Sequence, residues 1–170
     1  MFKQFRLCAV VAVFLAGPVQ SQDLPSVIEL GVLAATDPTT ALPQIDAALG
    51  RLAAPEHADV RLQFDLVRLK IDLLTDQGAG AQAAGLTAEL ASFAATHRDA
   101  LQRDPAVLWA EAAMRFEELG LLEEAFDLRE VLLAEYRDGA RAPQVLIAAL
   151  EDLALLARLL GDTVVAERFD

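Results

Sequence analysis

The residues of this chain best suited to chemistry are carboxylates, and they concentrate in one short stretch. Six of them fall within fourteen residues, at Glu117, Glu118, Glu123, Glu124, Asp127 and Glu130. Such a cluster could bind calcium, but it lacks the D-x-D-x-D-G loop spacing that supplies oxygen ligands around the ion. The stretch also flanks a predicted helix turn. A solvated helix face is therefore the favoured interpretation.

Other catalytic or metal-binding chemistry is sparse. The chain has two histidines, His57 and His97, and one cysteine, Cys8. Neither histidine has a second histidine one helical turn away, and no HExxH or cysteine pair is present to bind zinc. No GxSxG elbow marks a serine nucleophile. The Gly78-Ala79-Gly80 stretch lacks the lysine and threonine of a phosphate loop. We therefore expect no catalytic residues, no metal site and no cofactor.

The elements that would position a binding site form a repeat. An alanine recurs at positions 41, 83, 125 and 166, in steps of 42, 42 and 41 residues, and a glycine precedes each of the last three by five residues. A fixed period of this length is typical of stacked supersecondary units, each of which buries its neighbour's apolar face. We place helices at about 25–36, 39–53, 56–77, 79–97, 104–119, 121–137, 142–160 and 162–170. Asp37-Pro38 and Asp104-Pro105 predict helix starts, Gly139 predicts a left-handed residue after the helix over 121–137, and the residues after His97 are expected to form a loop. No segment shows the period-2 alternation of a strand, so the predicted fold class is all-α.

The two later units carry a family resemblance. Each has two apolar-periodic segments that meet at a glycine, Gly120 or Gly161. Bulky, apolar, small, aromatic or apolar, turn and small residues recur in the same order, at Trp109, Ala112, Ala113, Phe116, Gly120 and Ala125, then at Leu150, Leu153, Ala154, Ala157, Gly161 and Ala166. This spacing resembles the tetratricopeptide repeat family, in the longer variety found in kinesin light chains and in bacterial proteins that join such repeats to a caspase-like peptidase. Arg129 and Leu132 depart from the family's usual aromatic and alanine. The resemblance implies antiparallel helix hairpins stacked as a short right-handed α-solenoid.

The same resemblance implies a peptide-binding groove lined by the first helix of each hairpin. The positions that would face it are Arg68, Asp72 and Thr75; Ala110, Met114 and Glu117; and Glu151, Leu155 and Arg158. This set is mixed acidic and apolar with two arginines. We therefore expect an extended peptide or a partner helix of basic character to bind there.

The first 21 residues have the three parts of a secretory signal. Lys3 and Arg6 are basic, residues 7–16 form an apolar core, and Val19 and Ser21 are small residues before a predicted cleavage site after Ser21. Ten apolar residues are too few to span a bilayer. Cys8 lies inside this core rather than after it, which argues against a lipoprotein. Residues 22–170 are then one helical-repeat domain of about four helix pairs, the last incomplete, in a periplasmic or secreted protein.

The net charge and the apolar C-terminal helix restrict the kinds of partner that we expect. Loss of the signal would remove two of fourteen basic residues and keep all twenty-six acidic ones, for a net charge of −14. Such a chain repels nucleic acids and anionic membranes. Helix 142–160 is apolar on more than one stripe, which predicts self-association through this helix or a further domain downstream.

Three functions remain open from the sequence. The first is an exported, non-catalytic protein interaction module. The second is the amino-terminal recruiting part of a larger exported enzyme, such as a caspase-like peptidase, with its catalytic domain beyond residue 170. The third is an extracytoplasmic solute-binding or chaperone bundle without a true repeat.

Overall fold

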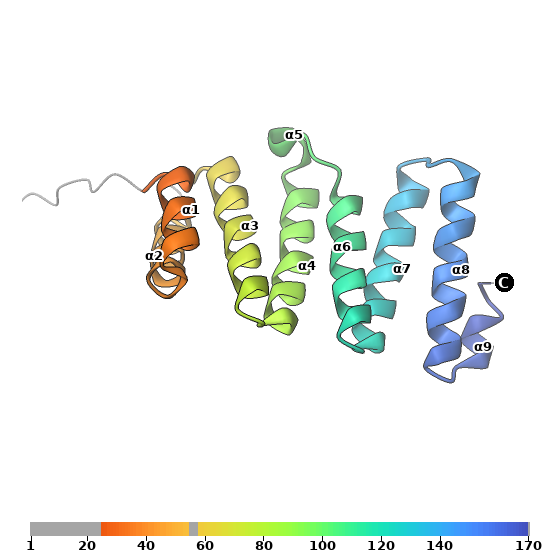
Figure 1. Ribbon diagram of the computed structural model, residues 1–170. Coiled ribbons are helices and arrows are strands. Elements are labelled where there is room, and N and C mark those ends of the chain that lie inside the picture. The colour runs from red at the N-terminus through yellow and green to blue at the C-terminus, as the bar shows by residue number, and fades with distance from the viewer. Residues whose placement is uncertain (1–24, 55–57, 170) are drawn as a thin grey trace, which may run out of the picture.

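The computed structural model describes residues 25–54 and 58–169, and these residues form an all-α structure without a strand. Figure 1 shows the helices in chain order along one elongated stack. Their bounds are α1 Val27–Thr36, α2 Pro38–Leu52, α3 Val60–Asp76, α4 Gly80–Thr96, α5 Arg98–Leu101, α6 Pro105–Glu118, α7 Leu122–Asp138, α8 Pro143–Leu159 and α9 Thr163–Ala166.

The helices pack as consecutive hairpins. The pairs α1 with α2, α3 with α4, α6 with α7 and α8 with α9 are in contact, and each hairpin packs on the next through α2 with α3, α4 with α6 and α7 with α8. Figure 1 shows that the two helices of a pair run in opposite directions. The predicted all-α stack of helix hairpins is therefore confirmed.

The turns inside the three later hairpins share one geometry. Gly78, Gly120 and Gly161 have φ angles of 74°, 72° and 83°, a region that glycine adopts without strain. After Gly120, the N–H of Leu121 donates to the carbonyl of Phe116 at 2.9 Å, and the N–H of Gly120 donates to Glu117 at 3.0 Å. This pair of bonds closes a Schellman motif, and Gly78 and Gly161 make the corresponding pairs. The glycines recur because each turn requires a left-handed residue.

The small residues that recur in the sequence lie on the second helix of each hairpin, at buried positions. Ala41, Ala83 and Ala125 are fully buried, and Ala166 is 2% exposed. The repeat seen in the sequence therefore corresponds to a repeated buried position.

The core runs through the stack as three clusters. The largest joins α3, α4, α6 and α7, and includes Phe64, Leu90, Trp109 and Leu132. A second joins α1, α2 and α3, and a third joins α7 and α8. Trp109 is 8% exposed, as its place on the small-residue face of its helix predicts. Its indole Nε1 is buried without a hydrogen-bond partner among the described residues.

Aspartate caps start two of the predicted helices. Asp104 accepts a hydrogen bond from the N–H of Ala106 at 3.1 Å, with Pro105 in the first turn of α6. Asp37 accepts one from the N–H of Thr40 at 3.2 Å and another from its hydroxyl at 2.6 Å. The bonds from the Thr40 hydroxyl and backbone lower the pKa of the Asp37 carboxyl. Both Asp-Pro signals are therefore helix starts, as predicted.

Three local predictions are wrong. Gly139 was expected to be the left-handed residue that ends α7, but its φ is −78° and the left-handed residue is Ala140, with φ 47°. The stretch after His97 was expected to be a loop, but Arg98–Leu101 forms the short helix α5. The last helix was expected over 162–170, but α9 ends at Ala166 and turns lead to Phe169, which packs edge-on against Phe126 of α7.

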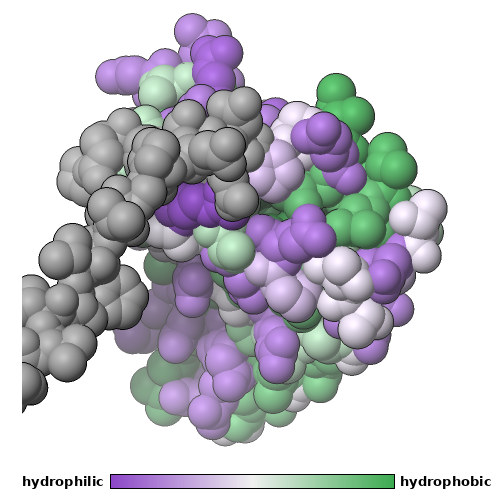
Figure 2. All heavy atoms as spheres, turned by 90° about the vertical axis from the view of Figure 1, so that its left-hand side faces the viewer, coloured by the Kyte–Doolittle hydropathy of each residue, from purple (hydrophilic) through white to green (hydrophobic). Residues whose placement is uncertain are grey.

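Figure 2 looks at the end of the stack that begins with α1 and α2. Hydrophilic residues cover most of the visible described surface, and hydrophobic residues gather at the upper right edge. On α1, the exposed large hydrophobic residues are Ile28 and Val32, at 79% and 61%. They lie on the side of α1 opposite Leu30, which packs into the core.

Candidate binding face on α3, α6 and α8

The first helices of the three later hairpins carry equivalent residues at equivalent places. Asp72 of α3, Met114 of α6 and Leu155 of α8 each lie six residues before the turn glycine of their hairpin. The Asp72 side chain is 58% exposed, and Met114 and Leu155 are 51% and 55% exposed. These three residues form a row across what we call the shared face of α3, α6 and α8.

Two further rows flank this one. Asp65, Val107 and Ala148 lie thirteen residues before the turn glycines, and Asp76, Glu118 and Leu159 lie two residues before them. All six are exposed, with Val107 at 65% and Leu159 at 61%. Each row therefore begins with an aspartate on α3 and ends with an apolar residue on α8.

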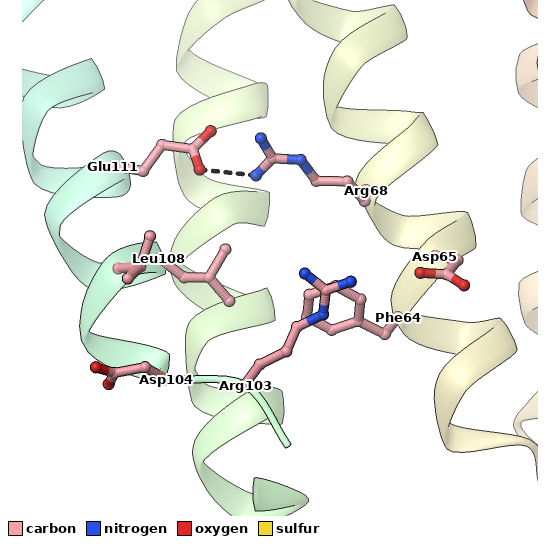
Figure 3. Close-up of a pocket in the computed structure, with 8 residues that line it drawn as sticks. Phe64, Asp65, Arg68, Arg103, Asp104, Leu108 and Glu111 are labelled. Carbon is pink, nitrogen blue, oxygen red and sulfur yellow. Dashed lines mark hydrogen bonds and ion pairs between the residues drawn. The ribbon is translucent and has the colours of Figure 1, made fainter. Parts of the chain in front are cut away.

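An ion pair links α3 to α6 across this face. The Nη1 of Arg68 donates to Oε2 of Glu111 at 2.7 Å, and Figure 3 shows the two side chains reaching toward each other in front of α4. Oε1 of Glu111 accepts a second bond, from Nη2 of Arg115, at 3.0 Å. The Nη1 of Arg115 donates to the Thr75 hydroxyl on α3, also at 3.0 Å. Two arginines thus satisfy one carboxylate and tie two hairpins together.

The surroundings of Glu111 act on its pKa in opposite directions. Its side chain is 21% exposed, and this burial raises the pKa. Hydrogen bonds from Arg68 and Arg115, together with their charges, lower it by more, so the pKa lies below its usual value. The bond to Glu111 likewise raises the pKa of Arg68 against the effect of burial. Both groups therefore stay charged at neutral pH.

Beside this ion pair the face is hollowed. A pocket of about 370 Å³ lies between α3 and α6, and its lining includes Phe64, Asp65, Arg68, Arg103, Val107 and Leu108. The Arg103 guanidinium carbon lies 4.8 Å from the centroid of the Phe64 ring, and Figure 3 shows the arginine across the ring. An adjoining hollow of about 470 Å³ is lined by Arg61, Leu101 and Gln102 together with Arg103. The pocket thus has an apolar base and a charged rim.

A second carboxylate contact links the next pair of hairpins. Arg129 of α7 bonds Glu117 of α6 at 2.8 Å and Asp152 of α8 at 3.1 Å. Asp152 and Glu111 each lie nine residues before their turn glycine. An arginine of the preceding hairpin therefore pairs with an acid at the same place in α6 and α8, whereas that place in α3 is Leu69.

The predicted groove residues differ in exposure and in the contacts that they make. The structure leaves Asp72, Met114, Glu151, Leu155 and Arg158 exposed on α3, α6 and α8. It engages Arg68, Thr75 and Glu117 in the hydrogen bonds and ion pairs described above, and leaves Ala110 partly buried. Binding by these residues stays a prediction.

Sequence reasoning missed several residues of the face. Glu111, Arg103 and Val107 were not among the predicted groove residues, although Val107 is the most exposed apolar residue of α6. Counting back from each turn glycine would have found Val107, because Asp65 and Ala148 share its place. Arg103 carried no such signal, since it lies before α6 and its position depends on the path of the chain after α5.

The structure also bears on the metal-binding and histidine chemistry considered from the sequence. Within residues 25–54 and 58–169, no three histidine, cysteine, aspartate or glutamate side chains group in a way that could hold a metal. His97 caps the end of α4 and its ring lies 4.5 Å from that of Phe93. His57 and the predicted signal lie outside the described residues. No helix in the described part of the chain is both long and apolar enough to cross a membrane.

The fold and this face define the class of the protein as an all-α stack of helix hairpins. Comparison with protein-family models finds no match, and neither does comparison with curated proteins.

Proposed function

We propose that this chain is an exported, non-catalytic interaction module of tetratricopeptide type, and that its shared face of α3, α6 and α8 binds a peptide segment of a partner protein. One observation carries the proposal. Apolar side chains at repeat-equivalent positions remain more than half exposed on one face, at Val107, Met114, Leu155 and Leu159. Apolar residues that gather on a surface in this way are typical of protein interaction sites.

The pocket between α3 and α6 supports the same proposal. Leu108 and Phe64 give it an apolar base, and it opens beside the exposed Val107. A partner side chain could bury apolar area there. At about 25 cal/mol per Å², an area of about 100 Å² contributes about 2.5 kcal/mol to binding before its entropic cost. Several such contacts along the face would give a specific, reversible complex.

The experiment is a selection of peptides on the purified protein, followed by measurement of their affinity by fluorescence anisotropy. Met114→Glu should weaken binding of the selected peptides strongly, because a charge would replace the centre of the face. Val131→Glu is the matched control, since Val131 is 40% exposed on α7 and lies outside the three rows. Equal loss in both variants, or selection of no peptide at all, would contradict the proposal.

Export is the second part of the proposal, and it rests on the three-part pattern of residues 1–21. Intact mass spectrometry of the protein from its host should show a mature chain that begins at or near Gln22. A cytoplasmic product that retains Met1 would contradict export and leave the binding proposal standing.

A further inference from the structure

The shared face is not uniform along the stack. On α3 the three rows begin with Asp65, Asp72 and Asp76, and on α8 they end with Ala148, Leu155 and Leu159. Within these rows the face therefore changes from acidic on α3 to apolar on α8, where the exposed Glu151 and Arg158, of opposite charge, flank Leu155 outside the rows. Any segment that crosses all three helices meets two different chemistries in a fixed order.

The three aspartates of the rows on α3 have few cationic partners within the described part of the chain. Within the described part of the chain, Asp65 and Asp76 form no ion pair, and the Asp72 carboxylate is 4.0 Å from Nε of Arg68. That arginine is already bonded to Glu111 at 2.7 Å. Asp65 and Asp76 therefore lack an arginine partner among the described residues, and Asp72 shares Arg68 with Glu111, so the three aspartates leave negative charge on α3. A basic side chain of the partner would be attracted to α3.

The apolar end is open to contact. Met114 on α6 is 51% exposed, and Leu155 and Leu159 on α8 are 55% and 61% exposed. The Glu118 carboxylate is the one charge that α6 and α8 contribute to the three rows. Apolar side chains of the partner would therefore bury area against α6 and α8 but not against α3.

The arrangement of the helices keeps the three contacts of a partner apart. The helices packed directly on each other are α4 with α6 and α7 with α8, and α3 and α8 are not packed directly on α6 in this way. The contact from α3 to α6 is made by two long side chains, those of Arg68 and Glu111, at 2.7 Å. A segment that reaches Asp72, Met114 and Leu155 therefore meets one helix after another, at separate places along its length.

From these observations we infer that the partner segment carries a basic residue and, further along its length, apolar residues, which contact Asp72, Met114 and Leu155 respectively. This inference rests on the proposed function and names the chemistry that the same face selects. The order of the three contacts follows from the order of the helices in Figure 1.

The test compares random nine-residue peptide libraries selected on the protein and on its Asp72→Lys variant. The protein should enrich peptides that carry a basic residue and, further along, apolar residues. Asp72→Lys should replace the basic preference by an acidic one, and should weaken binding of the original peptides by about tenfold through like-charge repulsion. Asp127→Lys is the control, because Asp127 is an exposed acid on α7 outside the rows.

The outcomes separate this inference from the proposed function. If Met114→Glu abolishes peptide binding but Asp72→Lys leaves the charge preference unchanged, the face binds peptides and this inference is wrong. Enrichment of apolar residues without a basic residue also overturns it. If neither protein enriches any peptide, the proposed function itself fails.

Discussion

Arg68 and Glu111, 43 residues apart in sequence, join two hairpins of the stack through a contact of 2.7 Å. Each lies on the first helix of its hairpin, and Glu111 also bonds Arg115. The contact therefore fixes α3 relative to α6 at the point where the pocket opens. A stack of hairpins is held by nearest-neighbour contacts of this kind together with its apolar core.

Loss of this carboxylate should weaken the stack. Glu111→Gln should lower the free energy of unfolding by about 1 kcal/mol, because the pair is partly exposed and screening by water limits its contribution. The measurement is urea unfolding followed by circular dichroism. A double-mutant cycle with Arg68→Met should show a coupling of about 0.5–1 kcal/mol. Additive effects of the two substitutions would mean that the pair does not stabilise the fold.

The contribution of Glu111 should also depend on pH. Because its pKa is lowered in the folded chain, its stabilisation is fully present above the unfolded carboxyl value of about 4.3 and disappears as pH falls through the lower, folded value. The stability difference between the protein and Glu111→Gln should therefore be constant from about pH 6 to 8 and shrink below about pH 4.3. Unfolding at a series of pH values measures it. A difference that grows with acidity would contradict the sign of the shift.

The turn residues give a matched pair of opposite effects. Gly120→Ala should destabilise the protein by about 1–2 kcal/mol, because a left-handed φ is strained for alanine. Ala140→Gly should stabilise it by about 0.5–1 kcal/mol, because the φ of 47° at that position suits glycine. Thermal unfolding of both variants is the measurement.

Gly85→Ala is the control for this pair. Gly85 lies inside α4, and an added Cβ would meet no atom within 4 Å. Alanine there should stabilise the helix by about 0.5–1 kcal/mol. If Gly120→Ala and Gly85→Ala had the same effect, backbone conformation would not explain the recurrence of the turn glycines.

Trp109 should matter for its size and not for its indole N–H. Trp109→Ala should cost about 3–5 kcal/mol, because it opens a cavity in the core that joins α3, α4, α6 and α7. Trp109→Phe should retain most of the stability, since the indole nitrogen has no hydrogen-bond partner to lose. Chemical unfolding of both variants separates the two contributions, and equal losses would contradict this account of the site.

The C-terminal hairpin should associate with a second copy at high concentration. Of the apolar residues expected to need cover on helix α8, Leu153 and Leu156 are buried, whereas Ile147 is 54% exposed; on α9, Val164 is 71% exposed. Light scattering should show association at tens of micromolar that Ile147→Glu abolishes and Val131→Glu does not. A stable monomer that binds no hydrophobic dye would show that the apolar residues of α8 do not drive association with a second copy.

The repeat explains which features the sequence could predict. Gly78, Gly120 and Gly161 mark the turns because few other residues adopt a positive φ, and Ala83 and Ala125 mark buried positions of the second helices. Ala140 carries no such signal, so the turn after α7 was assigned to the wrong residue. The helix α5 is only four residues long, too short for apolar periodicity to reveal.

The candidate face was predictable only in part. The resemblance to the tetratricopeptide family implied that Asp72, Met114 and Leu155 face a groove, and the structure leaves all three exposed. The same reasoning could not show that Arg68 is bonded to Glu111, because the two residues come from different hairpins. The position of Arg103 over Phe64 likewise depends on how α3 and α6 pack.

The most direct measurement is a methyl NMR titration of the protein with a peptide from the selection. The account predicts shifts at Val107, Met114, Leu155 and Leu159, the exposed apolar residues of the shared face. It predicts unchanged signals from Val131 on α7 and from Ile28 on α1, which are exposed elsewhere on the stack. Shifts confined to Val131 or Ile28, with the four signals of the shared face unmoved, would contradict the central claim.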